Sequence, residues 1–392
     1  MKKKIVIYLN ILPQEGGKYQ YSLSILQALN LFPTDAYLLY AIYTNDHWES
    51  QIPKSFNKLK IKYSFFHKII RGFFLKISFL FNTDLKIWRR IGKYLDTSHK
   101  AILSLNPDLV LYPTNSTIAY ELNIPTVATI FDLMHKYETN FPEVSGKKQV
   151  GLRDHHYKML CKYCTAILVD SMVGKDHVLE SYKAKGNDIH ILPYIAPNYD
   201  INCKNNPSLF TKYNIPDKFI FYPAQFWKHK NHKGLLKAIK HLKDGELVVN
   251  LVLVGSNKNT KLKPYIEKLN LQKQVYILNY VSNAELVALY KKATALVMPT
   301  FFGPTNIPQL EAFMLGCPVI TSNIYGIPAQ VGDAALLVNP KDSTDIANKI
   351  SMLWNDNVLR RELIKKGYIK NSQWTLNEFS KKFQSIVELT VK

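Results

Sequence analysis

Apolar and polar positions along the chain follow two periods in turn, which predicts alternating strands and helices. Short runs of β-branched and aromatic residues are each followed by a stretch in which apolar residues recur every three or four positions. Strands are expected over 4–10, 36–44, 59–65, 108–112, 125–131, 166–170 and 189–192, then from 219 and over 247–255, 275–278, 295–298 and 319–321. Helices fill the intervals, with later ones over 147–165, 342–354, 359–368 and 376–391. Such alternation predicts parallel sheets in an α/β fold.

One stretch without periodicity divides this pattern. Residues 193–207 read P-Y-I-A-P-N-Y-D-I-N-C-K-N-N-P and are rich in Pro and Asn. The chain has 392 residues, whereas single cores seldom grow beyond roughly 250–300 residues. We therefore expect two doubly wound, Rossmann-like domains that face each other across a cleft. The first covers 1–195, the hinge 196–216 and the second 217–375.

Composition is that of a globular protein, with 47% hydrophobic and 21% charged residues. No apolar run approaches the roughly 18–20 residues that span a bilayer, and the start M-K-K-K-I-V-I-Y-L-N reads as a strand rather than a signal peptide. Four cysteines without framework spacing fit a reducing cytoplasm. Cys161 and Cys164 form a C-x-x-C near His155 and His156. Packing on one helix face is favoured there over a zinc site.

The net charge of +21 requires an explanation. Residues 51–100 hold twelve Lys or Arg and two Asp, and within 67–93 large apolar residues alternate with basic ones. A basic amphipathic helix rich in Phe and Leu is typical of an anionic membrane surface. A helix that packs on the core and exposes its basic side explains the pattern equally well. Nucleic acid is disfavoured because no binding signature for it occurs.

Residues 299–340 carry the clearest chemical pattern. Pro299 ends a strand, turn formers run from Gly303 to Asn306, and Pro308 suits the first turn of a helix that ends at Gly316. A loop and a helix N-terminus of this kind suit a phosphate or another anion. Glu311, expected in the opening turn, either complements the helix dipole or accepts hydrogen bonds from a ligand's hydroxyl pair.

This stretch resembles the donor-site signature of retaining glycosyltransferases of the GT-B fold, in the large family of bacterial mannosyl- and glucosyltransferases. That signature has two glutamates seven residues apart, and its second half is matched by Glu311, Ala312, Gly316, Pro318, Val319 and Ile320. Gly303 stands where the first glutamate is expected. The resemblance implies that Glu311 holds the nucleotide ribose, while backbone N–H groups of Thr305, Asn306 and Ile307 replace the missing carboxylate. The string F-G-P-T-N-I-P resembles a subgroup with the same gap.

The resemblance extends along the chain and implies further site residues. Lys230 matches a lysine that clamps the donor diphosphate, and Gln225 stands where an arginine is usual. The remaining donor-side positions implied are Gly255, Ser256, Tyr280, Val281, Ser282, Gly303 and Pro304. On the acceptor side it implies Gly16 and Gly17, with His135 in place of a histidine that Phe131 replaces. Asp132 is expected to cap the following turn. The last helix, 376–392, is expected to pack on the first domain.

The function implied is transfer of a hexose from a nucleotide diphosphate sugar, and the subgroup likeness favours mannose. The acceptor would be a glycan or lipid-linked glycan in surface polysaccharide or O-antigen synthesis. Configuration would be retained by front-face displacement, with Lys230 meeting the departing charge. No D-x-D pair occurs in the chain, so no metal or other cofactor is expected. The expected location is cytoplasmic, on the inner membrane face if 67–93 contacts lipid. A nucleotide-sugar epimerase of similar fold and a non-catalytic nucleotide-sugar-binding module are the alternatives.

Overall fold

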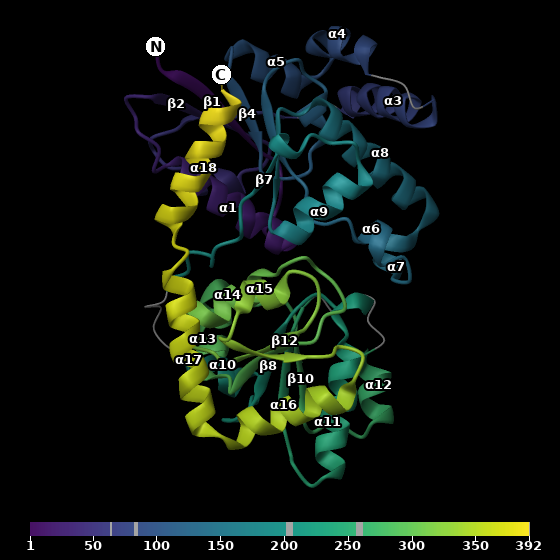
Figure 1. The fold of residues 1–392 in the computed structure, drawn as a ribbon, viewed down its shortest axis with the longest axis vertical. Coiled ribbons are helices and arrows are strands. Elements are labelled where there is room, and N and C mark those ends of the chain that lie inside the picture. The colour runs from purple at the N-terminus through teal and green to yellow at the C-terminus, as the bar shows by residue number, and fades with distance from the viewer. Residues whose placement is uncertain (63–64, 82–84, 201–206, 256–261, 392) are drawn as a thin grey trace. The chain divides into compact units, whose positions relative to one another are not determined.

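The computed structural model describes residues 1–62, 65–81, 85–200, 207–255 and 262–391. The chain divides into two compact units (Figure 1). Unit 1 comprises Met1–Tyr137, Ser145–Ile195 and Thr375–Lys392, and unit 2 comprises Glu138–Val144 and Ala196–Trp374. Each unit is therefore assembled from pieces that are separated in the sequence. No helix among the described residues is both long enough and apolar enough to cross a membrane.

Unit 1 is built on a seven-stranded parallel sheet with the order β3-β2-β1-β4-β5-β6-β7. Its strands are β1 (Lys3–Leu9), β2 (Tyr37–Tyr43), β3 (Asn57–Lys60), β4 (Leu109–Tyr112), β5 (Thr126–Thr129), β6 (Ala166–Val169) and β7 (Ile189–Ile191). Its helices are α1 (Gly17–Leu29), α2 (His47–Gln51), α3 (Phe65–Phe81), α4 (Lys86–Leu95), α5 (Thr97–Ser104), α6 (Met134–Tyr137), α8 (Lys147–Tyr163), α9 (Met172–Ser181) and α18 (Leu376–Thr390). Short 3-10 turns are η1 (Pro13–Glu15), η2 (Thr117–Tyr120) and η3 (Gly186–Asp188).

The C-terminal helix α18 packs on α1, at the opposite end of the sequence (Figure 1). Ser380 Oγ donates to the carbonyl of Ala28 at 2.8 Å, and the ring of Phe383 lies 5.8 Å from that of Phe32. Phe379 and Phe383 are fully buried. Burying two phenyl groups stabilises this contact by several kcal/mol, at roughly 1.5–3 kcal/mol each.

Unit 2 is built on a six-stranded parallel sheet with the order β10-β9-β8-β11-β12-β13. Its strands are β8 (Ile220–Pro223), β9 (Leu251–Val254), β10 (Val275–Leu278), β11 (Ala295–Met298), β12 (Val319–Ser322) and β13 (Ala335–Val338). Its helices are α10 (Pro207–Lys212), α11 (His232–Asp244), α12 (Leu262–Lys268), α13 (Asn283–Lys292), α14 (Ile307–Met314), α15 (Ile327–Val331), α16 (Ser343–Asn355) and α17 (Asn357–Ser372), with the turn η4 (Lys228–Lys230). Helix α7 (Pro142–Ser145) begins in unit 2 and ends in unit 1.

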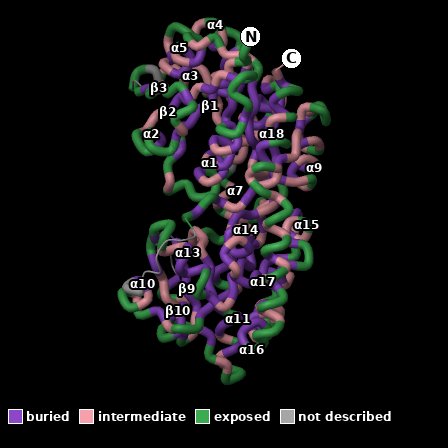
Figure 2. The backbone as a smooth tube through the Cα atoms, turned by 90° about the vertical axis from the view of Figure 1, so that its left-hand side faces the viewer, coloured by how far each residue is buried: buried purple, intermediate pink, exposed green. Residues whose placement is uncertain are grey.

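Burial follows the sheets in both units, where most strand residues are buried and outer helix faces are exposed (Figure 2). The predicted α/β class and the two doubly wound parallel sheets are confirmed. The predicted strands 275–278 and 295–298 match β10 and β11 at both ends.

Two predicted strands differ from the observed ones by four or more residues at one end, and each difference has a local reason. The strand expected over 59–65 ends at Lys60, and Phe65 opens α3 instead. The strand expected over 247–255 begins only at Leu251. The Leu247 N–H bonds back to the carbonyl of Leu242, which closes the C-terminus of α11. The first residue of the apolar run 247–249 thus caps the C-terminus of α11 instead of starting the strand.

Candidate functional site

The strand order of unit 2 reverses between β8 and β11, and the loops that follow these two strands part there. In open α/β sheets, ligands bind outside the carboxyl ends of strands at such a switch point. The two loops are tied together, since Phe301 N–H donates to the His229 carbonyl at 2.7 Å. Thr300 Oγ1 donates to the same carbonyl at 3.2 Å. This edge of the sheet is therefore the candidate site.

Lys230 lies in the loop after β8, at the end of the turn η4. Its carbonyl accepts a bond from the Tyr222 hydroxyl at 2.9 Å. The next residue, Asn231, is left-handed with φ of 57° and caps α11 through Gly234 N–H. Asn231 Nδ2 also donates to the carbonyls of Pro299 and Pro340, at 2.9 and 2.7 Å. The main chain that carries Lys230 is thus fixed on both sides.

The Lys230 ammonium points to the loop after β11, where its Nζ lies 3.4 Å from Asn306 Oδ1. Asn306 immediately precedes α14, and its Nδ2 is buried with no hydrogen-bond partner among the residues that the structure describes. A cation beside a helix N-terminus is an arrangement that attracts a phosphate-like anion. Lys230, Asn306 and the start of α14 are therefore brought together, whereas their binding of a diphosphate stays a prediction.

The loop from Gly303 to Asn306 is held by two glycines and one glutamine. Gly303 has φ of +127°, which disfavours any side chain there. A Cβ on Gly326 would lie 2.6 Å from the Pro304 carbonyl oxygen, so the loop approaches α15 closely. Gln330 bonds both the N–H and the carbonyl of Asn306, at 3.0 and 2.7 Å.

The bonds of Gln330 change one expectation about the loop amides. The Asn306 N–H was expected to face the donor, but it already donates to Gln330 Oε1. The Ile307 N–H lies in the first turn of α14, where backbone donors lack intrahelical acceptors. Of those two amides, Ile307 is the one placed to bind an anion. Thr305 lies in the same loop, and its methyl group faces Gly326.

Gly255 follows β9 and lies against the loop after β8. A Cβ at this position would come within 2.4 Å of the Ala224 carbonyl oxygen and 3.5 Å of Gln225 Cα. Only glycine fits so close an approach. The half-buried Gln225 is therefore beside the glycine expected at the donor loop. Ser256, expected next to it, lies outside the described residues.

Glu311 is buried, with 6% of its surface exposed, and both its oxygens accept tyrosine hydroxyls. Tyr199 Oη donates to Oε1 at 2.5 Å and Tyr290 Oη donates to Oε2 at 2.6 Å. Burial raises the pKa of the Glu311 carboxyl, and the two hydroxyl donors partly offset this. The expected place of Glu311 in the opening turn is wrong. Helix α14 begins at Ile307, so Glu311 is its fifth residue and lies in the second turn.

Tyr199 and Tyr290 were missed by the sequence analysis. Tyr290 lies on α13 at a position that reads only as a buried apolar residue, and it packs edge-on against Phe221. Tyr199 lies in the aperiodic stretch expected to form the hinge. The carboxylate that they hold is 112 and 21 residues away in the chain. No spacing rule connects residues across such separations.

The residues expected to face the nucleotide base begin after β10. Tyr280 is 70% exposed, Val281 is buried, and Ser282 caps α13 in a capping box with Glu285. Burial is the main cause that raises the pKa of Tyr199, followed by Glu311 and then Tyr280.

A seven-residue piece, 138–144, belongs to unit 2 although its neighbours in sequence belong to unit 1. Its Phe141 ring packs at 5.4 Å from the rings of both Phe301 and Phe302. Glu143 Oε1 accepts the His229 N–H at 3.3 Å, and Glu138 accepts a bond from the Tyr325 hydroxyl. We call residues 138–144 the brace. It contacts the loop of Lys230, the loop of Gly303 and the turn before Gly326.

The residues expected on the acceptor side lie in unit 1. Gly16 has φ of +61° and precedes α1, of which Gly17 is the first residue. His135 lies on α6 and is 1% exposed, and neither ring nitrogen has a hydrogen-bond partner. Burial, assisted by the Arg153 guanidinium, lowers the pKa of His135 to about 4. The imidazole is therefore neutral at physiological pH.

Asp132 has the capping role expected for it. Its Oδ1 accepts the Met134 N–H at 2.9 Å and the Arg153 guanidinium at 2.7 Å. Cys161 and Cys164 are free thiols, and Cys164 Sγ contacts the Ala119 carbonyl. The described residues contain no group of three His, Cys, Asp or Glu side chains suited to a metal.

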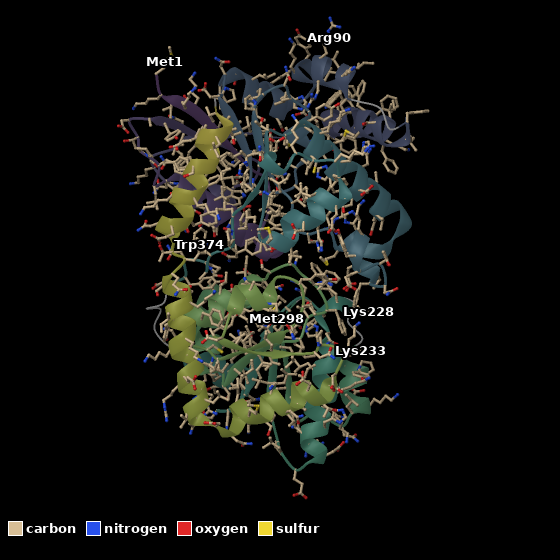
Figure 3. The ribbon with its side chains drawn as sticks, viewed as in Figure 1. Met1, Arg90, Lys228, Lys233, Met298 and Trp374 are labelled. Carbon is tan, nitrogen blue, oxygen red and sulfur yellow. The ribbon has the colours of Figure 1, made fainter. Side chains whose placement is uncertain are left out.

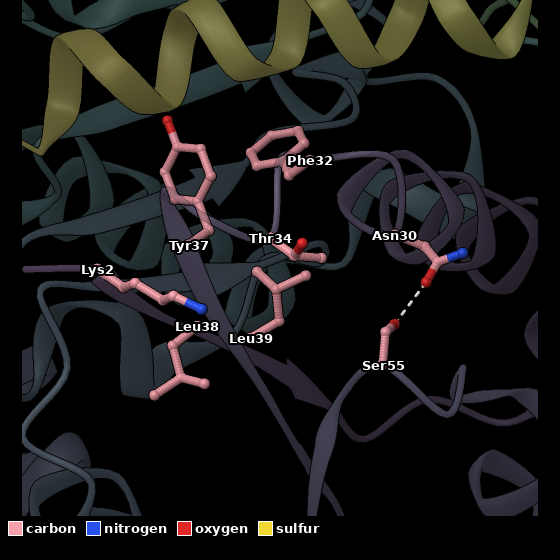
Figure 4. Close-up of a pocket in the computed structure, with 8 residues that line it drawn as sticks. All are labelled: Lys2, Asn30, Phe32, Thr34, Tyr37, Leu38, Leu39 and Ser55. Carbon is pink, nitrogen blue, oxygen red and sulfur yellow. Dashed lines mark hydrogen bonds between the residues drawn. The ribbon is translucent and has the colours of Figure 1, made fainter.

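A pocket in unit 1 lies away from these residues (Figure 4). Its volume is about 200 Å³, and Ser55 Oγ donates to Asn30 Oδ1 across it at 2.6 Å. Lys2 precedes β1 and Tyr37 opens β2, so the pocket lies at the amino ends of these strands. That is the edge of the sheet opposite to the one that binds ligands in such folds. The pocket is lined by Lys2, Asn30, Phe32, Thr34, Tyr37, Leu38, Leu39 and Ser55.

The two Rossmann-like sheets and the switch-point site define a GT-B fold, and solved structures agree along the whole chain. A glycosyltransferase from Rickettsia africae is similar with a TM-score of 0.69 at 15% identity, covering 100% of this chain and 99% of that one. Anabaena HepE, solved with UDP and glucose, is similar with a TM-score of 0.69 at 14% identity, covering 98% of both chains. Likeness at such low identity defines the fold.

Sequence comparison identifies the class of the second unit. Residues 206–370 match the family Glycosyl transferases group 1. The O-antigen chain mannosyltransferase RfbU of Salmonella typhimurium is 30% identical over 187 residues, which are 47% of this chain and 50% of that protein. The chain thus spans about half the length of this curated relative. Residues 206–370 are thus similar to group 1 glycosyl transferases, and part of this chain is similar to an O-antigen chain mannosyltransferase.

Proposed function

We propose that this protein is a retaining glycosyltransferase that moves a hexose from a nucleotide diphosphate sugar to a glycan or lipid-linked glycan. The observation that carries the proposal is the pairing of Lys230 Nζ with Asn306 Oδ1 at 3.4 Å, at the switch point of unit 2. Here a fixed cation meets the start of an eight-residue helix. A diphosphate is the ligand whose charge suits both.

The residues of unit 2 divide the work of donor binding. Lys230 and the Ile307 N–H contact the diphosphate and stabilise the charge that develops on it as the glycosidic bond breaks. Glu311 receives the ribose, and Gly255 allows the backbone to approach the ligand. Tyr280 to Ser282 face the base. In a front-face displacement the leaving phosphate oxygen takes the proton of the acceptor hydroxyl, so no protein carboxylate acts as nucleophile.

Mannose as the donor sugar, and surface polysaccharide or O-antigen as the product, are supported by the relatives. Their matches cover 47%, 49% and 40% of this chain, and the names of all three include mannosyltransferase. His135 and Gly16-Gly17 are proposed to act on the sugar and acceptor side. A neutral imidazole can donate to, or accept from, a sugar hydroxyl at any pH above about 5, since its pKa is about 4.

We further propose a cytoplasmic location at the inner face of the membrane, through α3 and α4. The two helices pack together at one end of unit 1 (Figure 1). Large apolar side chains are exposed on both, namely Phe65, Phe66, Ile69, Phe73, Leu80, Phe81, Ile87 and Tyr94. Exposed basic residues lie among them, namely Lys76, Lys86, Arg90 and Lys93. We call these residues the α3–α4 surface. A contiguous apolar and basic surface fits anionic lipid headgroups.

A screen of nucleotide sugars by thermal shift tests the donor assignment. Because a ligand that binds only the folded state stabilises it by about 2.7 kcal/mol at a hundred times its Kd, the matching nucleotide sugar should raise Tm by several degrees. Lys230→Ala should abolish the shift. If no nucleotide sugar raises Tm, the donor assignment is wrong.

Turnover with the matching donor then separates the proposal from its alternatives. A transferase releases nucleoside diphosphate faster when an acceptor glycan is added. An epimerase converts its substrate without any acceptor. A binding module shows a thermal shift and no turnover at all. Transfer that continues at full rate in EDTA supports a reaction without a divalent cation, which we propose because Lys230 supplies the cation at this site.

A further inference from the structure

We propose that the Tyr199 hydroxyl occupies, on Glu311, the place that a ribose hydroxyl of the donor takes, so that nucleotide binding displaces Tyr199. This inference rests on the proposed function and adds an internal competitor to the same site. It concerns a residue outside every predicted motif. The competitor comes from residues 196–200, which are the first part of the expected hinge.

The hydrogen bonds of Glu311 show the competition. Each carboxylate oxygen accepts one tyrosine hydroxyl, at 2.5 and 2.6 Å, and the carboxylate is buried. Distances this short are typical of O–H groups that donate to an ionised carboxylate. Each carboxylate oxygen has a second lone pair, but only 6% of the surface of Glu311 is exposed, so a ribose diol that donates to it needs the space that a tyrosine hydroxyl fills. One tyrosine must therefore move before the diol can reach the carboxylate.

Tyr199 is the partner that can leave. Tyr290 is held within helix α13, is fully buried, and packs edge-on with its ring 5.0 Å from that of Phe221. Tyr199 lies in an irregular segment between two exposed residues, Asn198 and Asp200. The way in for a nucleoside is therefore on the Tyr199 side.

The exchange of Tyr199 for a ribose hydroxyl lowers the apparent affinity for the nucleotide. With Tyr199 in place the site is closed, and the apparent Kd for a nucleotide is the intrinsic value divided by the fraction of open molecules. A hydrogen bond to a charged group contributes enough to keep that fraction near a tenth or lower. Donor binding would thereby be coupled to the position of residues 196–200. The ribose hydroxyls would restore the hydrogen bond that Tyr199 gives up.

Tyr199→Phe tests the exchange by calorimetry with UDP, GDP and ADP and with their 2′,3′-dideoxy forms. The variant leaves Glu311 Oε1 without its donor, so the nucleoside diphosphate that binds should bind about tenfold more tightly, which is 1.4 kcal/mol. The gain should vanish for the dideoxy form, which has no hydroxyl to supply. Unchanged or weaker binding, or an equal gain for the dideoxy form, overturns the inference.

Two matched variants control for the loss of a hydroxyl. Tyr290→Phe removes the hydrogen bond to Glu311 that is expected to remain in the nucleotide complex. The affinity of this variant for the nucleoside diphosphate should therefore fall or stay the same. Tyr276 lies on β10, and Tyr276→Phe removes a hydroxyl that donates to the Lys273 carbonyl. This change should have no effect on nucleotide affinity. If Tyr276→Phe tightens binding as much as Tyr199→Phe, the inference fails. Should no nucleoside diphosphate bind the unmodified protein, the proposed function fails as well.

Hydrogen exchange on the unmodified chain gives a second reading that requires no variant. Saturation with the nucleoside diphosphate should accelerate amide exchange in residues 196–200, because Tyr199 leaves its buried place. Its N–H donates to the Pro197 carbonyl at 3.0 Å and is one of the amides to follow. Slower or unchanged exchange in this segment contradicts displacement. Binding with slower exchange would leave the donor assignment intact and remove only the competitor.

Discussion

At the scale of single residues, Lys230 is positioned by its neighbours. Asn231 fastens the turn to the loop after β11 and to the Pro340 carbonyl, and Tyr222 holds the Lys230 carbonyl. The ammonium itself is therefore presented at a fixed place with little conformational entropy left to lose on binding. A second lysine in the same turn, Lys228, is exposed, and Figure 3 shows it on the outside of unit 2.

Lys230→Ala should lower the rate of donor hydrolysis about a hundredfold, since removing one group that stabilises developing charge typically costs that factor or more. The rate is measured as nucleoside diphosphate release from the nucleotide sugar selected by the screen. Lys228→Ala makes the same change of charge in the same turn and should alter the rate less than twofold, because its charge is solvated. Equal losses in the two variants would show that net charge, and not position, matters.

Sequence reasoning singled out Lys230, Gly255, Gly303 and Glu311 from the family resemblance and from their places near strand ends and turns, and their roles stay predictions. It could not reach the partners of these residues. Tyr199, Gln330 and Glu143 are brought to the site by tertiary contacts with separations of 112, 24 and 86 residues. The spacing of apolar residues along the chain does not indicate which distant residues contact each other.

At the scale of elements, the predicted order of strands and helices is correct, whereas several ends are not. Strand β3 is shorter than its apolar pattern, because Phe65 and Phe66 are used as exposed helix residues. The brace could not be foreseen. A segment of seven residues has no periodicity, and its partners His229 and Tyr325 lie 86 and 187 residues further along the chain.

One buried carboxylate joins three helices of unit 1. Glu121 accepts bonds from Arg71 of α3 and Trp88 of α4, and His99 of α5 lies 3.1 Å from it. Burial alone would raise the pKa of Glu121, but Arg71 and His99 outweigh it and lower the pKa from near 4.5 to about 2. This cluster attaches the α3–α4 surface to the rest of the unit.

Glu121→Gln should lower the free energy of unfolding by about 3–5 kcal/mol, as expected when one partner of a buried ion pair is removed. Because the folded pKa is depressed, the stabilisation is present above pH 4.5 and is lost as the pH falls towards 2. The difference between variant and parent, measured by urea unfolding with tryptophan fluorescence, should therefore shrink over that range.

A surface pair supplies the matched control for Glu121. Asp244 pairs with Lys240 on α11, and both are partly exposed. Asp244→Asn should cost less than about 1 kcal/mol at any pH, as surface ion pairs do. A difference at Glu121 that stays constant from pH 7 to pH 2.5 would mean that packing, and not its charge, provides the stability.

At the scale of the whole molecule, only part of the net charge of +21 can be assigned to one surface. The α3–α4 surface gathers exposed basic groups with exposed phenyl rings, and Figure 3 shows Arg90 pointing away from the unit. Ile70, Phe74 and Leu75 of α3 pack on the core, as a core-facing helix requires, but much of the helix's apolar surface does not. Six large apolar residues of α3 are exposed, namely Phe65, Phe66, Ile69, Phe73, Leu80 and Phe81.

The protein should float with vesicles that contain phosphatidylglycerol and not with vesicles of phosphatidylcholine alone, with binding reduced at high salt. The double change Arg90→Glu and Lys93→Glu should weaken binding more than tenfold, since each basic residue near an anionic surface contributes about 1 kcal/mol. The same charge change at Lys381 and Lys382, both exposed on α18, should have a smaller effect. Equal losses from the two pairs would indicate a diffuse charge effect without a docking surface.

The division of the chain has a practical outcome for hybrid proteins. The polypeptide passes between the units at 137/138, 144/145, 195/196 and 374/375. A graft that joins the first half of this protein to the second half of a relative would leave Phe141 and Glu143 facing foreign donor loops. Recombinants that exchange residues 138–144 together with 196–374 keep those loops with their own support, so they should retain nucleotide affinity where simple two-part fusions lose it.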